Sequence, residues 1–174
     1  YFNYERAMVA PSDGMPNVFA PEMKHRALTK DEIHTLVDVM INSAALAQEA
    51  GCDGVEIHAI HEGYLLDQFA MSNFNHRTDE YGGCLENRLR ISTEMIEGIK
   101  RVCGADYPVL MRYSVASKTA GFNQSVLPGQ DYEEFGRSLE ESMSVVRILE
   151  KAGIDALDCD NGTYDSWHWC HPPT

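Results

Sequence analysis

The stretch AGCDGVEIH, residues 50–58, returns later in the chain as AGIDALDCD, residues 152–160. In both stretches an alanine–glycine pair ends a run of apolar residues at helical spacing, and a short apolar strand follows. Between these two stretches, another unit joins a helix over roughly residues 86–102 to the strand PVLMRYS, residues 108–114. Short apolar strands that alternate with amphipathic helices predict a parallel sheet covered by helices, either an open doubly wound sheet or a (β/α)8 barrel.

The expected helices carry recognisable start and stop signals. Thr29 and Glu32 form a capping-box pattern immediately before apolar residues at helical spacing. Asp131, with Glu134 three residues later, shows the same chemistry. We therefore predict that the third helix begins at Asp131 and ends near Gly153.

The two faces of each expected strand differ, and this difference favours the barrel. Side chains alternate along a strand, so one face is apolar while the other becomes polar toward the C-terminal end. The polar positions are Glu56, His58, Arg112, Asp158 and Asp160. Polar groups at the C-terminal ends of parallel strands are what the active site of a barrel enzyme requires.

A whole barrel typically takes about 250 residues and eight units. This chain of 174 residues contains three helix–strand units. We therefore expect residues 1–174 to be part of one TIM-barrel domain, whose remaining units and any C-terminal domains belong to a longer protein. The first residue is Tyr1 rather than Met, which agrees with that expectation.

Composition excludes several classes of partner. A net charge of −13 argues against a nucleic-acid partner, which would call for a basic surface. No apolar run approaches the length of a membrane span, so no membrane role is expected. The five cysteines form no C-x-x-C pair, which favours a reducing cytoplasm over a disulfide framework and places no iron–sulfur cluster in this stretch.

Four segments resemble one known family. They are HAIHEGYLLDQF (58–69), NHRTDEYGGCLENRLR (75–90), VLMRYSV (109–115) and DALDCDNGTYDSWHWCHPPT (155–174). Together they resemble the Old Yellow Enzyme superfamily of NADH:flavin oxidoreductases, in the branch of 2-enoate reductase, 2,4-dienoyl-CoA reductase and the bile-acid-inducible oxidoreductases. The resemblance runs from about Ala10 to the end of the chain. We interpret the RTDEYGG block, whose glycines indicate a tight turn, as scaffold.

The resemblance implies a fold, a reaction and cofactors. The fold is a (β/α)8 barrel that binds FMN. The reaction is hydride transfer to or from a C=C bond conjugated to a carbonyl, as in an enoate, a 2,4-dienoyl-CoA or a 3-oxo-4-ene steroid or bile-acid thioester. The branch also implies FAD, a [4Fe–4S] cluster and NAD(P)H in the full-length protein, at sites outside this chain. Assembly of the full-length enzyme as a homo-oligomer stays open.

The resemblance also assigns roles to five residues. His58 and His61 match the two donors that hold the oxygen of the activated carbonyl, where negative charge develops during hydride transfer. Tyr64 matches the proton donor to the α-carbon, and Arg112 matches the arginine that lies against the flavin ring. His168, in a Trp-His pair, resembles the histidine that joins the proton relay in dienoyl-CoA reductases.

Other interpretations of the same residues remain open. His58 and His61, with Asp160, could hold the zinc-bound water of a metal-dependent barrel hydrolase. His58 could also be a core histidine satisfied by backbone groups, and Tyr64 a packed ring. Arg112 could pair with Glu56, Asp158 or Asp160, because a charge inside a barrel needs a partner. A further alternative is an incomplete fragment with no activity by itself, since three units leave open sheet edges.

Overall fold

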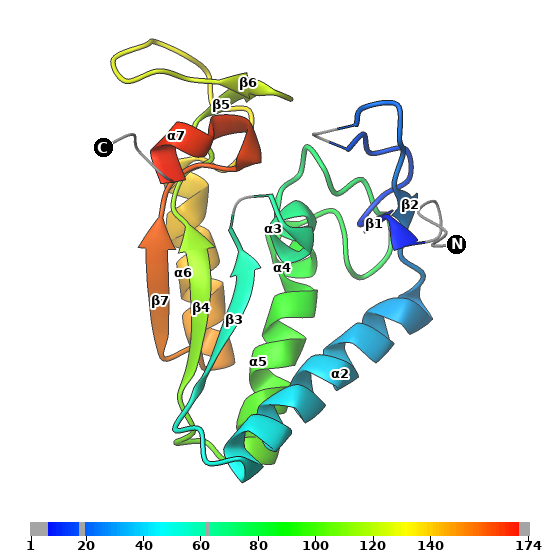
Figure 1. Cartoon of the computed structure of the whole chain (residues 1–174), viewed down its shortest axis with the longest axis vertical. Coiled ribbons are helices and arrows are strands. Elements are labelled where there is room, and N and C mark those ends of the chain that lie inside the picture. Colours follow the sequence, from blue (N-terminus) through cyan, green and yellow to red (C-terminus); the bar gives the residue numbers. More distant parts are fainter. Residues whose placement is uncertain (1–6, 18–19, 62, 171–174) are drawn as a thin grey trace.

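A computed structural model describes residues 7–17, 20–61 and 63–170 of the chain. Its centre is a parallel sheet with the strand order β3-β4-β7. All three strands point toward the end of the molecule where β5, β6 and α7 lie (Figure 1). Each strand follows a helix in the sequence, so the predicted helix-then-strand order is confirmed; the units are α2 (Lys30–Glu49) with β3 (Val55–Ile60), α5 (Arg90–Cys103) with β4 (Val109–Ser114), and α6 (Leu139–Ala152) with β7 (Ala156–Asp160).

Shorter elements occupy the connections. The first two form a small parallel pair before α2, and the others lie in the loops that follow the three strands of the sheet. They are β1 (Val9–Ala10), β2 (Arg26–Ala27), α3 (Leu65–Ala70), α4 (Leu85–Arg88), β5 (Thr119–Gly121), β6 (Gln124–Ser125), the 3-10 helix η1 (Tyr164–Ser166) and α7 (Trp167–Cys170). No helix in the described ranges is long and apolar enough to cross a membrane.

The first long helix begins where the sequence predicts. The Thr29 side chain accepts a hydrogen bond from the backbone N–H of Glu32, and the Glu32 carboxylate accepts one from the backbone N–H of Thr29 at 2.9 Å. Leu28 and Ile33, on either side of this cap, are both buried in the core. The capping box therefore fixes the start of α2 and directs its apolar side into the sheet.

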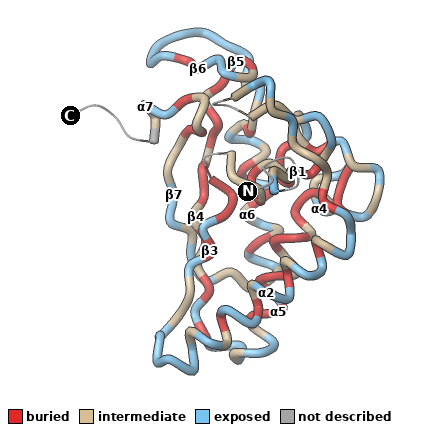
Figure 2. The backbone as a smooth tube through the Cα atoms, turned by 45° about the vertical axis from the view of Figure 1, so that its right-hand side comes forward, coloured by how far each residue is buried: buried red, intermediate tan, exposed pale blue. Residues whose placement is uncertain are grey.

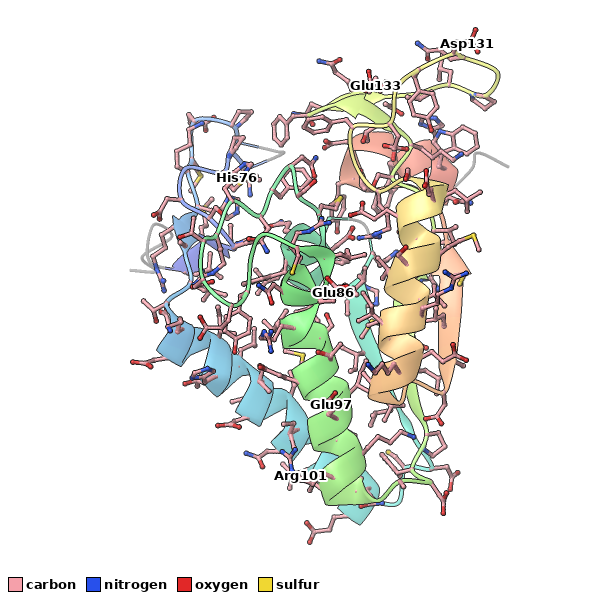
Figure 3. All side chains as sticks on the ribbon, turned by 180° about the vertical axis from the view of Figure 1, so that it is seen from behind. His76, Glu86, Glu97, Arg101, Asp131 and Glu133 are labelled. Atoms are coloured by element: carbon pink, nitrogen blue, oxygen red, sulfur yellow. The ribbon has the colours of Figure 1, made fainter. Side chains whose placement is uncertain are left out.

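The predicted start of the third helix at Asp131 is wrong. Asp131 and Glu133 lie in the loop that leads into the N-terminal end of α6 (Figure 3). The helix begins only after Ser138, whose hydroxyl accepts from the backbone N–H of Glu141. The Glu134 carboxylate accepts hydrogen bonds from backbone N–H groups outside any helix, those of Lys118, Thr119 and Gly136. Glu134 thus bonds to a segment that is distant in the sequence and does not form the local helix cap that the sequence pattern indicated.

The two faces of the sheet differ as predicted. The outer face, which packs against the helices, carries Ile57, Val109 and Met111, all buried. The inner face carries the polar positions, and Figure 2 shows much of β7 exposed where β4 is buried. We use "inner face" for the face that holds His58 and Arg112, which are partners in the β3–β4 register. Burial of apolar area on the outer face stabilises the fold, and the inner face is left for polar side chains.

One ion pair ties the loops above the sheet together. Asp67 of α3 and Arg137, just before α6, form a salt bridge with exposed fractions of 0% and 1%. Arg137 also donates to the backbone oxygen of Ser114 at 2.9 Å, and Asp67 accepts from the backbone N–H of Gly63 at 2.8 Å. The pair therefore holds the loop after β3 against the end of β4.

The RTDEYGG block is also anchored by hydrogen bonds. Arg77 forms an ion pair with Asp79 at 2.6 Å and donates to the backbone oxygens of Pro11 and Leu28. Its guanidinium thus joins three segments that are distant in the sequence. These contacts agree with the interpretation of the block as scaffold.

Candidate active site

A shift in strand register brings the two predicted histidines to one face of the sheet. His58 pairs with Arg112, but Ile60 pairs with Tyr113, so one extra residue of β3 is accommodated at Ala59. In a regular strand, residues three apart project to opposite faces. A bulge of this kind restores the same face, and the His58 and His61 rings lie 4.9 Å apart between centroids.

Tyr64 completes a compact group with the histidines. Its ring centroid lies 5.1 Å from that of His58 and 5.7 Å from that of His61. Gly63 adopts φ 77°, in the left-handed region that favours glycine. The side chain of Gln68 donates to the Gly63 backbone oxygen at 2.7 Å. The Gly63 backbone N–H also donates to Asp67, so two side chains of α3 hold the turn, and the turn directs Tyr64 back toward the strand end.

The hydroxyl partner of Tyr64 is Tyr164 of η1. The two hydroxyl oxygens are 2.7 Å apart, and the Tyr164 ring stacks on Trp167 at 5.2 Å with an interplanar angle of 11°. Trp167 is exposed at the surface of the described structure. The arrangement links Tyr64 to a surface side chain through one further hydroxyl group.

The structure does not bring His168 into this group. Its Nε2 lies 3.1 Å from the backbone oxygen of Val126, and its Nδ1 lies 3.3 Å from the Ser125 hydroxyl. These contacts place His168 against the β5–β6 hairpin, while Tyr164 takes the position beside Tyr64. The relay role of His168 therefore remains a prediction that this geometry does not support.

Arg112 is held on the inner face by two carboxylates of the neighbouring strand. Its Nη1 donates to Asp158 at 2.5 Å, and its Nη2 and Nε donate to Asp160 at 2.8 and 3.2 Å. These hydrogen bonds, first to Asp158 and then to Asp160, raise the pKa of Arg112 above its ordinary value. Arg112 is thus a fixed cation, and two of the three partners proposed from the sequence are the ones it uses.

Asp160 connects Arg112 to the histidine group. Its Oδ2 lies 2.9 Å from His61 Nδ1, and its Oδ1 accepts from the Ser114 hydroxyl at 2.8 Å. His61 is almost fully buried, whereas His58 is exposed on the inner face. His61 is therefore buried and held by protein contacts, whereas the exposure of His58 does not support the alternative that His58 is a core histidine.

These contacts weigh against the metal interpretation of the same residues. Both oxygens of Asp160 already accept hydrogen bonds from Arg112 and Ser114. Within the described ranges, no group of three or more His, Cys, Asp or Glu side chains is arranged to hold a metal ion.

Some site residues are not apparent from sequence reasoning. Tyr164 meets Tyr64, and Ser114 meets Asp160, only because the ends of the parallel strands and the loops that follow them converge. A signal for Tyr164 does exist. It lies in the loop that follows the third expected strand, and loops at the C-terminal ends of barrel strands carry functional groups.

Comparison with known proteins gives this geometry a family. Residues 4–169 match the NADH:flavin oxidoreductase / NADH oxidase family. The chain is 52% identical over 168 residues to a cinnamate reductase of Clostridium sporogenes, covering 97% of this chain and 25% of that protein. It is 36% identical over 141 residues to an NADH oxidase of Thermoanaerobacter brockii, covering 81% of this chain and 19% of that protein.

Solved structures of related enzymes resemble the fold of this chain. A complex of 2-naphthoyl-CoA reductase with 2-naphthoyl-CoA superposes with a TM-score of 0.76 at 29% identity, over 91% of this chain and 22% of that one. The old yellow enzyme homologue of Zymomonas mobilis superposes with a TM-score of 0.67 at 30% identity, over 89% of this chain and 42% of that one. The chain thus spans a quarter of the cinnamate reductase that it resembles, and its three units form part of a (β/α)8 barrel. It belongs to the NADH:flavin oxidoreductase / NADH oxidase family, within the Old Yellow Enzyme superfamily.

Proposed function

We propose that the full-length protein containing this chain is an FMN-dependent ene-reductase, which acts by hydride transfer on a C=C bond conjugated to a carbonyl or carboxyl group. The observation that carries the proposal is the register shift in β3, because it gathers His58, His61 and Tyr64 on the face that also holds Arg112. Residues 1–174 would then be part of one FMN-binding domain.

The donor chemistry of Arg112 fits a reduced flavin. A guanidinium has five N–H donors, and three of them are used on Asp158 and Asp160 among the described residues. The remaining two, on a side chain that is 28% exposed, suit the anionic edge of the reduced ring. When bound there, FMN supplies the hydride.

His58 and His61 would hold the substrate oxygen. As hydride reaches the β-carbon, negative charge develops on the carbonyl oxygen, and preorganised N–H donors stabilise it. The 2.9 Å contact between Asp160 Oδ2 and His61 Nδ1 orients the ring. A ring that contacts the carboxylate in this way and also donates to a substrate oxygen must carry a proton on both nitrogens.

Tyr64 would supply the proton. Its hydroxyl group gives a proton to the α-carbon as the new C–H bond at the β-carbon forms, and it then regains a proton from the Tyr164 hydroxyl at 2.7 Å. Tyr164 in turn takes a proton from water. The product has gained one hydride and one proton, and both tyrosines return to their starting state.

An enoate is the substrate class that the relatives favour. One of them is named a cinnamate reductase and another a 2-naphthoyl-CoA reductase. Cinnamate has a C=C bond between its carboxylate and its aromatic ring, and 2-naphthoyl-CoA has a thioester carbonyl conjugated with the double bonds of the ring itself. A 2,4-dienoyl-CoA or a bile-acid thioester presents the same reactive unit, and the reverse reaction, desaturation, uses the same groups. FAD, a [4Fe–4S] cluster and NAD(P)H would bind in the remainder of the protein, which we expect to be cytoplasmic.

The test is a visible spectrum of the full-length protein purified without oxygen, followed by titration with a phenol and an assay with an aryl enoate. We expect flavin bands, a long-wavelength charge-transfer band on addition of phenol, and reduction of the enoate. The double variant H58A/H61A should keep the flavin bands and lose the charge-transfer band. A colourless protein with stoichiometric zinc would overturn the proposal.

A further inference from the structure

One carboxylate reaches across the sheet. Asp160 lies at the end of β7, and its side chain contacts groups from both other strands of the sheet, His61 after β3 and Arg112 and Ser114 on β4. Its own side chain is 11% exposed. In the order β3-β4-β7, His61 and Asp160 come from strands that are not neighbours.

The reach depends on the residue between them. Neighbouring strands are about 4.8 Å apart, so side chains from two strands away must span roughly 10 Å. Ser114, which pairs with Asp160 in the register, occupies the position between them on β4. Its small side chain leaves room above the strand, and its hydroxyl donates to the Asp160 carboxylate instead of blocking it.

We propose that Asp160 is the positioning residue that sets the oxygen clamp and the flavin-facing arginine relative to each other. The inference rests on the proposed function. One oxygen, Oδ2, accepts from Arg112 Nη2 at 2.8 Å and lies 2.9 Å from His61 Nδ1. A single atom thus joins the group that would face the flavin to the group that would hold the substrate oxygen.

The carboxylate also determines how His61 can act. A carboxylate only accepts hydrogen bonds, so the 2.9 Å approach of Asp160 Oδ2 favours the form of His61 in which Nδ1 carries a proton. Asp160 then sets the orientation of the His61 ring. A carboxylate on the second ring nitrogen of a metal-bound histidine sets the orientation of that ring in the same way. Loss of the carboxylate would remove one contact of the ring and free one edge of the guanidinium.

Asp158 provides a matched control within the same strand. It is two residues from Asp160 and bonds the same arginine, at Nη1, but the structure gives it no contact with His61 among the described residues. The changes D160N and D158N each remove one negative charge next to Arg112. Only D160N also replaces the charged acceptor beside His61 by a neutral amide.

The experiment uses the full-length protein with bound FMN and measures two quantities, the phenol dissociation constant from the charge-transfer band and the midpoint potential of the flavin. Both variants should shift the potential in the positive direction, because the Arg112 charge is less neutralised and the anionic reduced flavin is favoured. D160N should weaken phenol binding about tenfold, the difference expected when the acceptor of one hydrogen bond loses its charge. D158N should leave it within about twofold.

A double-mutant cycle separates positioning from a general loss of structure. In an H61A background, D160N should no longer weaken phenol binding beyond the effect of H61A itself. Equal phenol affinities of D160N and D158N, or a full D160N effect without His61, would overturn the inference. If D160N fails to retain FMN, S114A removes one bond to the same carboxylate together with the 3.4 Å contact of the Ser114 hydroxyl with His61 Nδ1. S114A should weaken phenol binding by a smaller factor, whereas wild-type affinity in S114A would overturn the inference.

The proposed function fails by a different result. A wild-type protein that binds no FMN, or that gives no charge-transfer band with phenol, contradicts the ene-reductase assignment before any variant is made. If the wild-type protein binds FMN and gives the charge-transfer band, but D160N and D158N bind phenol with equal affinity, only the role of Asp160 is contradicted.

Discussion

Two arginine–aspartate groups lie at the same end of the sheet and differ in what surrounds them. Arg137 and Asp67 are buried between loops, where they bond to each other and to backbone groups of Ser114 and Gly63. Arg112 and Asp158 lie on the inner face, with exposed fractions of 28% and 46%. The buried pair holds the loops that carry the site, while the inner-face pair keeps donors available. Similar chemistry thus serves structure or function according to burial.

The strongest test of this difference is to remove one charge from the buried pair. D67N leaves the Arg137 guanidinium buried without its counter-ion, and it also weakens the bond that Gly63 makes to the carboxylate. We expect the free energy of unfolding to fall by about 3–5 kcal/mol. Urea denaturation of the full-length protein measures it. A loss below 1 kcal/mol would show that the pair does not hold the loops.

The next largest effect concerns catalysis at the inner face. H58A/H61A removes both predicted donors to the substrate oxygen, so turnover of an aryl enoate should fall by about 100-fold or more. FMN content should remain that of the wild type. H34A, a change on the exposed side of α2, is the control and should leave turnover intact. Turnover that survives the double change would contradict the oxygen-clamp role.

A smaller effect is expected from the tyrosine pair. Y164F removes only the hydroxyl that lies 2.7 Å from the Tyr64 hydroxyl, so protonation should slow about tenfold while hydride transfer to the flavin is unchanged. Stopped-flow kinetics of the two half-reactions, with a solvent isotope effect on the second, measure this. Y113F removes a tyrosine hydroxyl that bonds Ser142 on the outer face and should leave the protonation rate alone. Equal rates in Y164F and the wild type would exclude Tyr164 from the proton path.

The smallest effect completes the comparison of the two pairs. D158N makes the same chemical change as D67N, but at a half-exposed carboxylate whose arginine keeps Asp160 as a partner. The free energy of unfolding should fall by less than about 1 kcal/mol. The same urea titration measures it, and a loss as large as that of D67N would mean that burial does not separate the two pairs.

Much of the fold was predictable because its signals are local. The cap at Thr29 needs only the residues up to Glu32, and the alternation of Val109, Leu110, Met111 and Arg112 assigns the two faces of β4 without knowledge of its neighbours. The failure at Asp131 has the opposite cause. Its cap pattern is equally good, but Glu134 finds partners at Lys118 and Thr119 in another segment.

For the candidate site, the sequence by itself determined which chemical groups stand at the strand ends: two imidazoles, a phenol, a guanidinium and the carboxylates. Only the tertiary structure decided which of them meet. The spacing of His58 and His61 predicts opposite faces in a regular strand, and the register shift against β4 reverses that result. The contact of Asp160 with His61 spans three strands. Strand register and cross-strand contacts depend on how segments that are distant in the sequence pack together, and no local pattern of residues determines that packing.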